Sequence, residues 1–175
     1  MTEKSIRLAG IIRESITDGP GIRFVVFCQG CPHHCEGCHN QETWDFNGGK
    51  DVSIEKILDA IDQNGLINGV TFSGGEPFQQ PEAFLALAKE IRKRGLDLMI
   101  YTGYLYEDLK AKNDPNIDEL IHLADYIVDG PFILEQRDIS LKFRGSTNQR
   151  IIDVKETEKM ADSNKIILAK EFMVC

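Results

Sequence analysis

Four cysteines gathered near the start of the chain are the residues best suited to chemistry. They fall within an 11-residue window and are Cys28, Cys31, Cys35 and Cys38. The fifth, Cys175, stands apart at the last position, where we expect an unligated thiol. A secreted disulfide scaffold spreads an even number of cysteines to join distant segments, whereas this set is odd in total and too compact to do so. The pattern therefore indicates thiolate ligands for zinc or for an iron–sulfur cluster.

The spacing of the four thiols leaves three ways to use them. Structural zinc usually draws two cysteine pairs from knuckles about a dozen or more residues apart, which makes a zinc site cramped here. A cluster closed by all four thiolates, Cys28 included, would only transfer electrons. A [4Fe–4S] cluster held by Cys31, Cys35 and Cys38 would leave one iron open to a small molecule. Cys28 would then be an inert, buried cysteine at the end of a strand.

Two glycine-rich segments carry a further signal. The sequence SGGEP at residues 73–77 places Gly74 and Gly75 directly after an apolar run. Glycine has no Cβ, so the backbone there either approaches a ligand closely or takes the positive φ of a tight strand-to-helix turn. Glu76 is either part of that site or an ordinary exposed acid. The sequence DGPG at residues 18–21 has the composition of a turn, and it either shapes the mouth of a site or only connects two segments.

These segments lie between alternating strand and helix patterns. Apolar, β-branched runs predict strands, and amphipathic stripes predict helices between them. The expected strands cover residues 22–28, 70–73, 96–102, 125–128, 151–154 and 165–169. The expected helices begin after Ser53 and at Pro81, and two shorter ones cover residues 107–112 and 117–123. Alternation of this kind predicts an α/β fold with a parallel sheet and helical crossovers.

The length of the chain limits the architecture. At 175 residues it is short for a complete eight-fold barrel of about 250 residues. We therefore expect a partial, open βα barrel of parallel strands with outer helices, forming one domain over residues 1–175. In such sheets the chemistry lies at the carboxyl ends of the strands. The cysteine loop, residues 73–77 and residues 101–103 each follow an expected strand, so we expect all three on one rim.

The charge balance and the first residues exclude several settings. Lys and Arg total 20 against 28 Asp and Glu, a formal net charge of −8. Nucleic acids and anionic membrane surfaces attract basic faces, so neither is an expected partner. No apolar run approaches the roughly 18 residues of a membrane helix, and the N-terminal residues lack the layout of a signal peptide. We expect a cytoplasmic protein.

Three motifs together resemble one enzyme superfamily. CPHHCEGC at residues 31–38 resembles the C-x3-C-x2-C loop of radical S-adenosylmethionine (SAM) enzymes, and residues 73–77 resemble their GGEP motif on the second strand. DGPGIR at residues 18–23 resembles a segment of glycyl-radical-enzyme activases. With GPF at 130–132 and the polar residues 144–150, the chain resembles the activating proteins of anaerobic ribonucleoside-triphosphate reductases, from about residue 10 to 155.

Other members of the superfamily fit less well. Activases of the pyruvate formate-lyase type are the alternative, since they share DGPGIR and the cluster loop. They are typically longer, and several add ferredoxin-like cysteines that are missing from this sequence. A modified-nucleoside synthase of reduced size gives no reason for DGPGIR.

The resemblance implies a cofactor set and a reaction. One [4Fe–4S] cluster per chain would be bound in a loop at about residues 29–47 by Cys31, Cys35 and Cys38, and SAM would chelate the fourth iron. One electron would split SAM into methionine and a 5′-deoxyadenosyl radical, which abstracts a hydrogen from a glycine of the reductase. The expected partners are the anaerobic ribonucleotide reductase and a low-potential electron donor such as flavodoxin.

The resemblance also implies the residues that contact SAM. The expected contacts lie on the cysteine loop and at two strand tips: Gly37, Cys38, His39, Gly74, Gly75, Glu76 and Thr102. Many radical SAM enzymes carry an aromatic residue in place of Gly37, and related activases often carry an acid in place of Tyr101. We expect solvated loop positions for His33 and His34. Asp129 either faces the site or caps a helix, and residues 144–150 either dock the reductase or form a plain polar loop.

Overall fold

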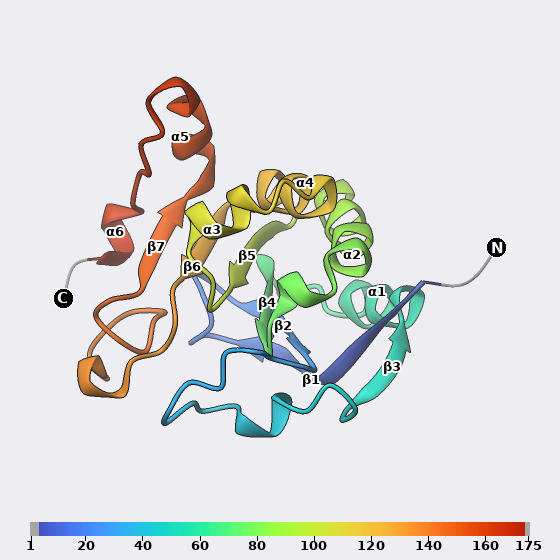
Figure 1. Cartoon of the computed structure of the whole chain (residues 1–175). Coiled ribbons are helices and arrows are strands. Elements are labelled where there is room, and N and C mark those ends of the chain that lie inside the picture. The colour runs from blue at the N-terminus through green and yellow to red at the C-terminus, as the bar shows by residue number, and fades with distance from the viewer. Residues whose placement is uncertain (1–3, 174–175) are drawn as a thin grey trace.

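The computed structural model describes residues 4–173, which fold around one curved seven-stranded sheet (Figure 1). The strand order across the sheet is β3-β1-β2-β4-β5-β6-β7. The strands are β1 (Ser5–Ser15), β2 (Arg23–Cys28), β3 (Lys50–Ser53), β4 (Gly69–Gly74), β5 (Asp97–Tyr101), β6 (Tyr126–Asp129) and β7 (Arg150–Asp153). β3 and β7 are the two ends of this order, so the sheet is an open βα barrel of the kind the sequence predicts.

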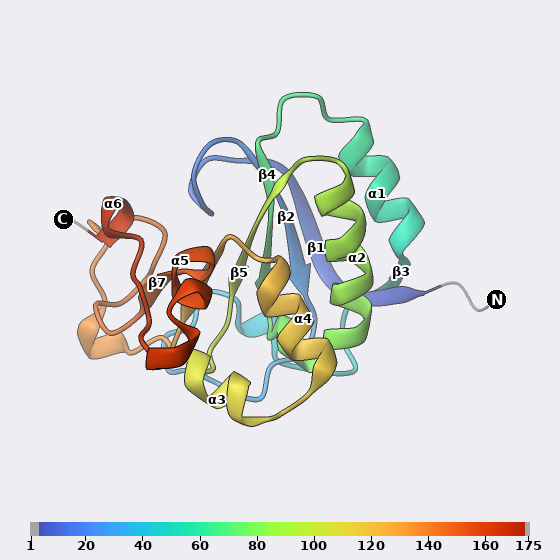
Figure 2. The ribbon, with the colours of Figure 1, turned by 90° about the horizontal axis from the view of Figure 1, so that it is seen from above.

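Four central strands run parallel, as expected. β2 pairs with β4, β4 with β5, and β5 with β6. Most of their side chains are buried, which is why these strands stand out as continuous apolar runs. The helices beside them are α1 (Ile54–Asp62), α2 (Pro81–Lys93), α3 (Tyr106–Ala111) and α4 (Pro115–Leu123). Figure 2 shows α1, α2 and α4 along one face of the sheet, where they form the main apolar core with it.

The outer strands are antiparallel, so the parallel order that the sequence predicts applies to the centre of the sheet only. β1 pairs with β2 and β3, and β7 pairs with β6, all in antiparallel registers. The sequence does not predict β1 and β3, because most of their residues are exposed or half-buried and form no apolar run. Residues 165–169 are not the expected strand. They form one isolated bridge, between Leu168 and Ile152.

Helix boundaries follow signals in the sequence. The Ser53 hydroxyl accepts a hydrogen bond from the Lys56 N–H and caps α1. Pro81 is the first residue of α2, and Gly95 follows its end with a φ of +72°. The remaining helices are α5 (Val154–Lys159), α6 (Lys170–Met173) and short 3₁₀ helices at Gln41–Thr43, Pro77–Gln79, Leu134–Gln136 and Ala161–Ser163. None of the helices in residues 4–173 has the length and apolar character that a bilayer crossing needs.

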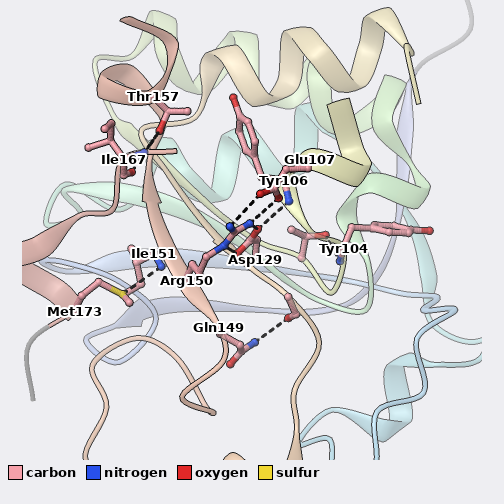
Figure 3. A network of polar contacts seen from close by, with 12 residues as sticks. Tyr104, Tyr106, Glu107, Asp129, Gln149, Arg150, Ile151, Thr157, Ile167 and Met173 are labelled. Carbon is pink, nitrogen blue, oxygen red and sulfur yellow. Dashed lines mark hydrogen bonds and ion pairs between the residues drawn. The ribbon is translucent and has the colours of Figure 1, made fainter. Parts of the chain in front are cut away.

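Arg150, at the start of β7, attaches the last strand to its neighbours (Figure 3). Its guanidinium donates to the Asp129 carboxylate at 2.9 and 2.5 Å and to the Glu107 carboxylate at 3.1 and 2.7 Å. Asp129 is fully buried and also accepts from the N–H of Tyr106, the first residue of α3. Asp129 therefore serves the end of a helix, the second of the two roles the sequence allows. This network holds β7 beside β6. It thereby positions the loop that connects these two strands, part of which lines a cavity.

Candidate functional site

A cavity of about 370 Å³ opens at the carboxyl ends of β2, β4 and β5. Its wall includes Cys31, Cys35 and Cys38 from the loop after β2, residues 73–75 at the end of β4, and residues 101–103 at the end of β5. Parallel pairing brings the carboxyl ends of the three strands to one edge of the sheet. The prediction that these three segments share one rim is confirmed.

Backbone hydrogen bonds hold the cysteine loop at this edge. The Gly30 N–H donates to the Thr43 carbonyl at 2.7 Å, and the Cys31 N–H donates to the Trp44 carbonyl at 3.2 Å. Gly30 itself has a φ of +97°, a conformation that glycine adopts without strain. The loop therefore leaves β2 through a turn and is closed on itself by residues about a dozen positions later.

The three thiols suit a cluster better than a single ion. Cys31 is 9% exposed, and Cys35 and Cys38 are half-buried. Burial raises the pKa of the Cys31 and Cys35 thiols above the usual 9.0, so their thiolates need a cationic partner. Within residues 4–173 no three His, Cys, Asp or Glu side chains are grouped as ligands of one metal ion. Cysteine thiolates are the usual ligands of [4Fe–4S] clusters, so the chemistry of this donor set fits such a cluster.

Cys28 lies on the other face of β2. Successive side chains of a strand point to opposite faces, so Phe27 lines the cavity while Cys28 packs into the core against the helices. The Cys28 thiol is fully buried, 3.1 Å from Nε2 of Gln80 and 3.5 Å from the Glu76 carbonyl. Burial raises its pKa to about 12, so the thiol stays protonated. Cys175, expected to be unligated, lies outside the described residues.

Gly74 and Gly75 bring β4 into close contact with the end of β2. A Cβ on Gly74, whose φ is +87°, would lie 2.7 Å from the backbone nitrogen of Cys28. A Cβ on Gly75 would lie 2.4 Å from the carbonyl oxygen of Gly30. The Gly75 N–H donates to the Cys28 carbonyl at 2.7 Å, and the next N–H along the chain donates to Gly30 at 2.8 Å. The tight-turn explanation therefore applies to Gly74, whereas Gly75 leaves room for the Gly30 carbonyl; both residues form part of the cavity wall.

Glu76 is fully buried, so the alternative of an ordinary exposed acid is wrong. Its carboxylate accepts from the Thr102 hydroxyl at 2.9 and 3.0 Å and from the Gly103 N–H at 2.9 Å. It also accepts from the Phe78 N–H at 3.1 Å and lies 2.7 Å from Nε2 of His33. The Glu76 carboxylate therefore links the ends of β4 and β5 to the cysteine loop.

The two histidines between Cys31 and Cys35 have defined partners, which the sequence does not reveal. The His33 side chain is 16% exposed, and its ring lies edge-on to Tyr104 with the centroids 4.5 Å apart. The expectation of a solvated position is wrong for His33. His34 is exposed, but its ring stacks on Trp44 at 4.6 Å, and its φ is +48°. The partner of His33 lies 43 positions away in the chain, so no local pattern indicates the pair.

The third cysteine is flanked by residues that meet the loop after β6. Gly37 has a φ of +75°, and a Cβ there would lie 2.8 Å from Cδ1 of Leu134 and 3.4 Å from the Phe132 ring. The ring of His39 lies 5.5 Å from that of Phe132, which lines the cavity. An aromatic ring therefore lies beside the loop although position 37 is a glycine. Two members of the polar segment 144–150, Gly145 and Gln149, also line the cavity.

The DGPG turn reaches the same cavity. Asp18 is part of the cavity wall, and its backbone carbonyl accepts from the Thr71 hydroxyl at 2.7 Å. Arg23 is fully buried and donates to Thr71 at 2.7 Å and to the Pro20 carbonyl at 3.0 Å. A Cβ on Gly19 would lie 2.6 Å from Cδ of Arg23. The arginine at the end of the motif therefore holds the turn in place, and the glycine leaves room for it.

The fold and the site define an iron–sulfur class of α/β protein. Among models of protein families, the one described as "4Fe-4S single cluster domain" matches residues 17–152. That range contains the cysteine loop, residues 73–77 and every residue of the cavity wall. The chain is a single-cluster [4Fe–4S] protein by this criterion.

Comparison with known proteins narrows the class. The chain is 37% identical over 142 residues to the anaerobic ribonucleoside-triphosphate reductase-activating protein of Escherichia coli K12, and the match covers 77% of this chain and 90% of that protein. It is 38% identical over 130 residues to the pyruvate formate-lyase-activating enzyme of Clostridium pasteurianum, with coverage of 68% and 54%. Among solved structures, QueE from Escherichia coli matches with a TM-score of 0.45 and 21% identity, covering 57% of this chain and 53% of that one. The chain belongs to the family of anaerobic ribonucleoside-triphosphate reductase-activating proteins.

Proposed function

We propose that this chain activates an anaerobic ribonucleoside-triphosphate reductase by generating a glycyl radical on it, through reductive cleavage of SAM at a [4Fe–4S] cluster. One observation carries the proposal: three thiols, the glycine turn of β4 and the tip of β5 line the same cavity. A closed electron carrier or a zinc-stabilised binding module would need the thiols, but it would not need the glycine turn of β4 or the tip of β5 beside them. The family of the chain supports the same reaction.

The cysteines of the loop would hold the cluster. Cys31, Cys35 and Cys38 would each bind one iron through a thiolate, and SAM would occupy the fourth. When bound, the cluster supplies the electron that splits SAM into methionine and a 5′-deoxyadenosyl radical, and this radical takes a hydrogen atom from a glycine of the reductase. Cys28 has no part in ligation, because its thiol is buried in the core away from the cavity.

Residues of the rim would hold SAM. The amino group of SAM carries N–H donors, so its partners on residues 74–76 must be acceptors. The N–H groups of Gly75 and Glu76 already donate to carbonyls of the loop, and the Glu76 carboxylate is fully buried with both oxygens engaged, which leaves backbone carbonyl oxygens for this role. Thr102 holds that carboxylate in place. The residues proposed to contact the adenine are Gly37 and His39, which flank the cluster ligand Cys38.

Aromatic side chains would shield the reacting atoms. Phe27, Trp44 and Phe132 line the cavity beside the thiols, and their rings reduce the space left for water. A radical and a low-potential electron both need such exclusion, since water and other small molecules offer side reactions. Asp18 lies in the same wall, where the glycine segment of the reductase would enter.

The electron donor, the cellular compartment and the domain organisation are further parts of the proposal. We propose that the electron comes from a low-potential protein donor such as flavodoxin and that the chain works in the cytoplasm. We also propose that residues 1–175 act as one domain with the cluster loop at about 29–47. A single sheet from β1 to β7 supports the one-domain assignment, and the net charge of −8 argues against docking on an anionic membrane surface.

Anaerobic reconstitution followed by low-temperature EPR tests the proposal. The full chain is loaded with iron and sulfide, reduced, and measured with and without SAM. We expect a cluster signal that changes when SAM is added, with 5′-deoxyadenosine as product. A cluster signal indifferent to SAM would indicate a closed electron carrier, and tight zinc binding without a cluster would exclude the enzyme.

A pyruvate formate-lyase-type activase is the second candidate, because the chain also matches such enzymes. The extent of the matches favours the first: the alignment covers 90% of the reductase-activating protein but 54% of the formate-lyase-activating enzyme. Incubating the reduced chain and SAM with each glycyl-radical enzyme separately distinguishes the two. We expect the glycyl radical signal in the reductase and not in the lyase.

A further inference from the structure

His33 connects the cysteine loop to the strand tips through one strong contact. Its Nε2 atom lies 2.7 Å from Oε2 of Glu76, whose carboxylate is fully buried. The other partners of this carboxylate, Thr102, Gly103 and Phe78, all come from the segments that follow β4 and β5. His33 is therefore the side chain of the cysteine loop that reaches this carboxylate.

The surroundings of His33 are shaped to hold the ring in one place. Tyr104 lies edge-on to it, and a Cβ on Gly103 would lie 2.4 Å from Cδ2 of His33. Position 103 therefore needs glycine because the imidazole occupies the space of a side chain. A ring confined in this way has few alternative orientations, so the contact with Glu76 is pre-formed.

The neighbouring histidine, His34, fixes the same turn of the loop. His34 takes a left-handed conformation in this turn and stacks on Trp44. The two histidines thus fix the loop from both sides, through Glu76 on one side and Trp44 on the other.

We infer that His33 is a positioning residue: by holding the Glu76 carboxylate against the cysteine loop, it sets the orientation in which the cluster-bound SAM is received. The inference rests on the proposed function, since Glu76 belongs to the proposed SAM site. A buried carboxylate that loses one of its donors turns toward another partner or toward water. The iron ligands would keep their places, while the part of the cavity wall that this carboxylate holds, at His33, Thr102 and Gly103, would shift.

SAM affinity of the oxidised, cluster-loaded chain tests the inference without turnover, by anaerobic equilibrium dialysis. His33→Leu removes the donor and keeps an apolar side chain of similar reach. We expect its Kd for SAM to rise at least about tenfold, the loss that accompanies removal of a hydrogen bond to a charged group, while the iron content stays that of the unmodified chain. His33→Gln, whose amide nitrogen can donate to Glu76, is expected to restore affinity to within about threefold.

A second histidine–glutamate pair supplies the matched control. His122 on α4 lies 2.9 Å from Glu158, but this pair is on the surface and its residues are not in the cavity wall. His122→Leu is expected to leave both the Kd for SAM and the iron content unchanged. Unchanged SAM affinity in His33→Leu, or equal weakening in the Leu and Gln variants, would overturn the inference.

Trp44 reports on the same connection when no cluster is present, because it is the single tryptophan of the chain. Quenching of its fluorescence by acrylamide measures how firmly the loop is held. We expect greater quenching in His33→Leu than in the unmodified chain, and near-normal quenching in His33→Gln. If the unmodified chain binds no SAM, the proposed function fails, whereas equal quenching in all three chains rejects the His33 connection itself.

Discussion

The Sγ atom of Cys28 lies 3.1 Å from Nε2 of Gln80, on the face of β2 that packs against the helices. Cys28 therefore lies on the opposite side of β2 from Cys31, Cys35 and Cys38, which line the cavity. The division follows from the alternation of side chains along β2, because Phe27 takes the cavity side and Cys28 the core side. Four neighbouring cysteines thus become one structural thiol and three candidate ligands.

Alanine substitutions of single cysteines should reproduce this division. Cys31→Ala, Cys35→Ala and Cys38→Ala are each expected to abolish 5′-deoxyadenosine formation and to lower the iron and sulfide content after reconstitution. Cys28→Ala is expected to keep the cluster and most activity. It should cost about 1 kcal/mol of stability for one deleted buried heavy atom. Loss of the cluster in Cys28→Ala would show that four thiolates close it.

Gly74→Ala is expected to destabilise the fold itself. The new Cβ would lie 2.7 Å from the backbone nitrogen of Cys28, and the φ of +87° is one that alanine rarely adopts. Backbone atoms cannot swing aside as a flexible side chain does, so we expect a loss of about 1–3 kcal/mol in the free energy of unfolding. Urea denaturation of the cluster-free chain measures it.

The matched control for this change is Gly65→Ala. Gly65 has no atom within 4 Å of its would-be Cβ and no positive φ. The same substitution there should leave the unfolding midpoint nearly unchanged. Equal effects at the two positions would mean that the contact between β4 and β2 is not what requires glycine at position 74.

The parts of the fold that the sequence predicts are those with strong local signals. The central strands are apolar because they are buried, and Ser53 and Pro81 mark helix starts by their own backbone chemistry. The common rim of the site was predictable for the same reason, since parallel strands bring their carboxyl ends together. Each of these inferences needs only a short window of sequence.

The parts that escape prediction depend on partners far along the chain. β3 has four residues, all exposed or half-buried, and forms because it pairs with residues 5–8 of β1. The burial of Glu76 and its contact with His33 depend on a loop that begins more than 40 positions earlier. Phe132 likewise reaches His39 from the segment after β6. Such contacts leave no periodicity or motif in either segment.

Asp129→Asn should be among the costlier polar substitutions in the chain. Asp129 is fully buried and pairs with Arg150, and it also accepts from the Tyr106 N–H. Removing one charge of a buried pair leaves the other poorly compensated, which typically costs about 3–5 kcal/mol. Arg150 retains Glu107, so we expect the lower end of that range in urea denaturation. Asp51→Asn, in the surface pair with Arg7, should cost less than about 1 kcal/mol, and a similar cost at both sites would contradict the burial argument.

Glu107→Gln should change stability in a pH-dependent way. The hydrogen bond from Arg150 lowers the pKa of Glu107 below its usual 4.5. A carboxyl group with a lowered folded-state pKa stabilises the fold above its unfolded pKa, and this contribution is lost as the pH falls through the folded value. The Glu107 side chain is 56% exposed, so we expect the unmodified chain to be more stable at pH 7 by less than about 1 kcal/mol. Urea denaturation from pH 7 downward should show this difference shrinking below pH 4.5; a difference that stays constant or grows there would mean that the ion pair is not its source.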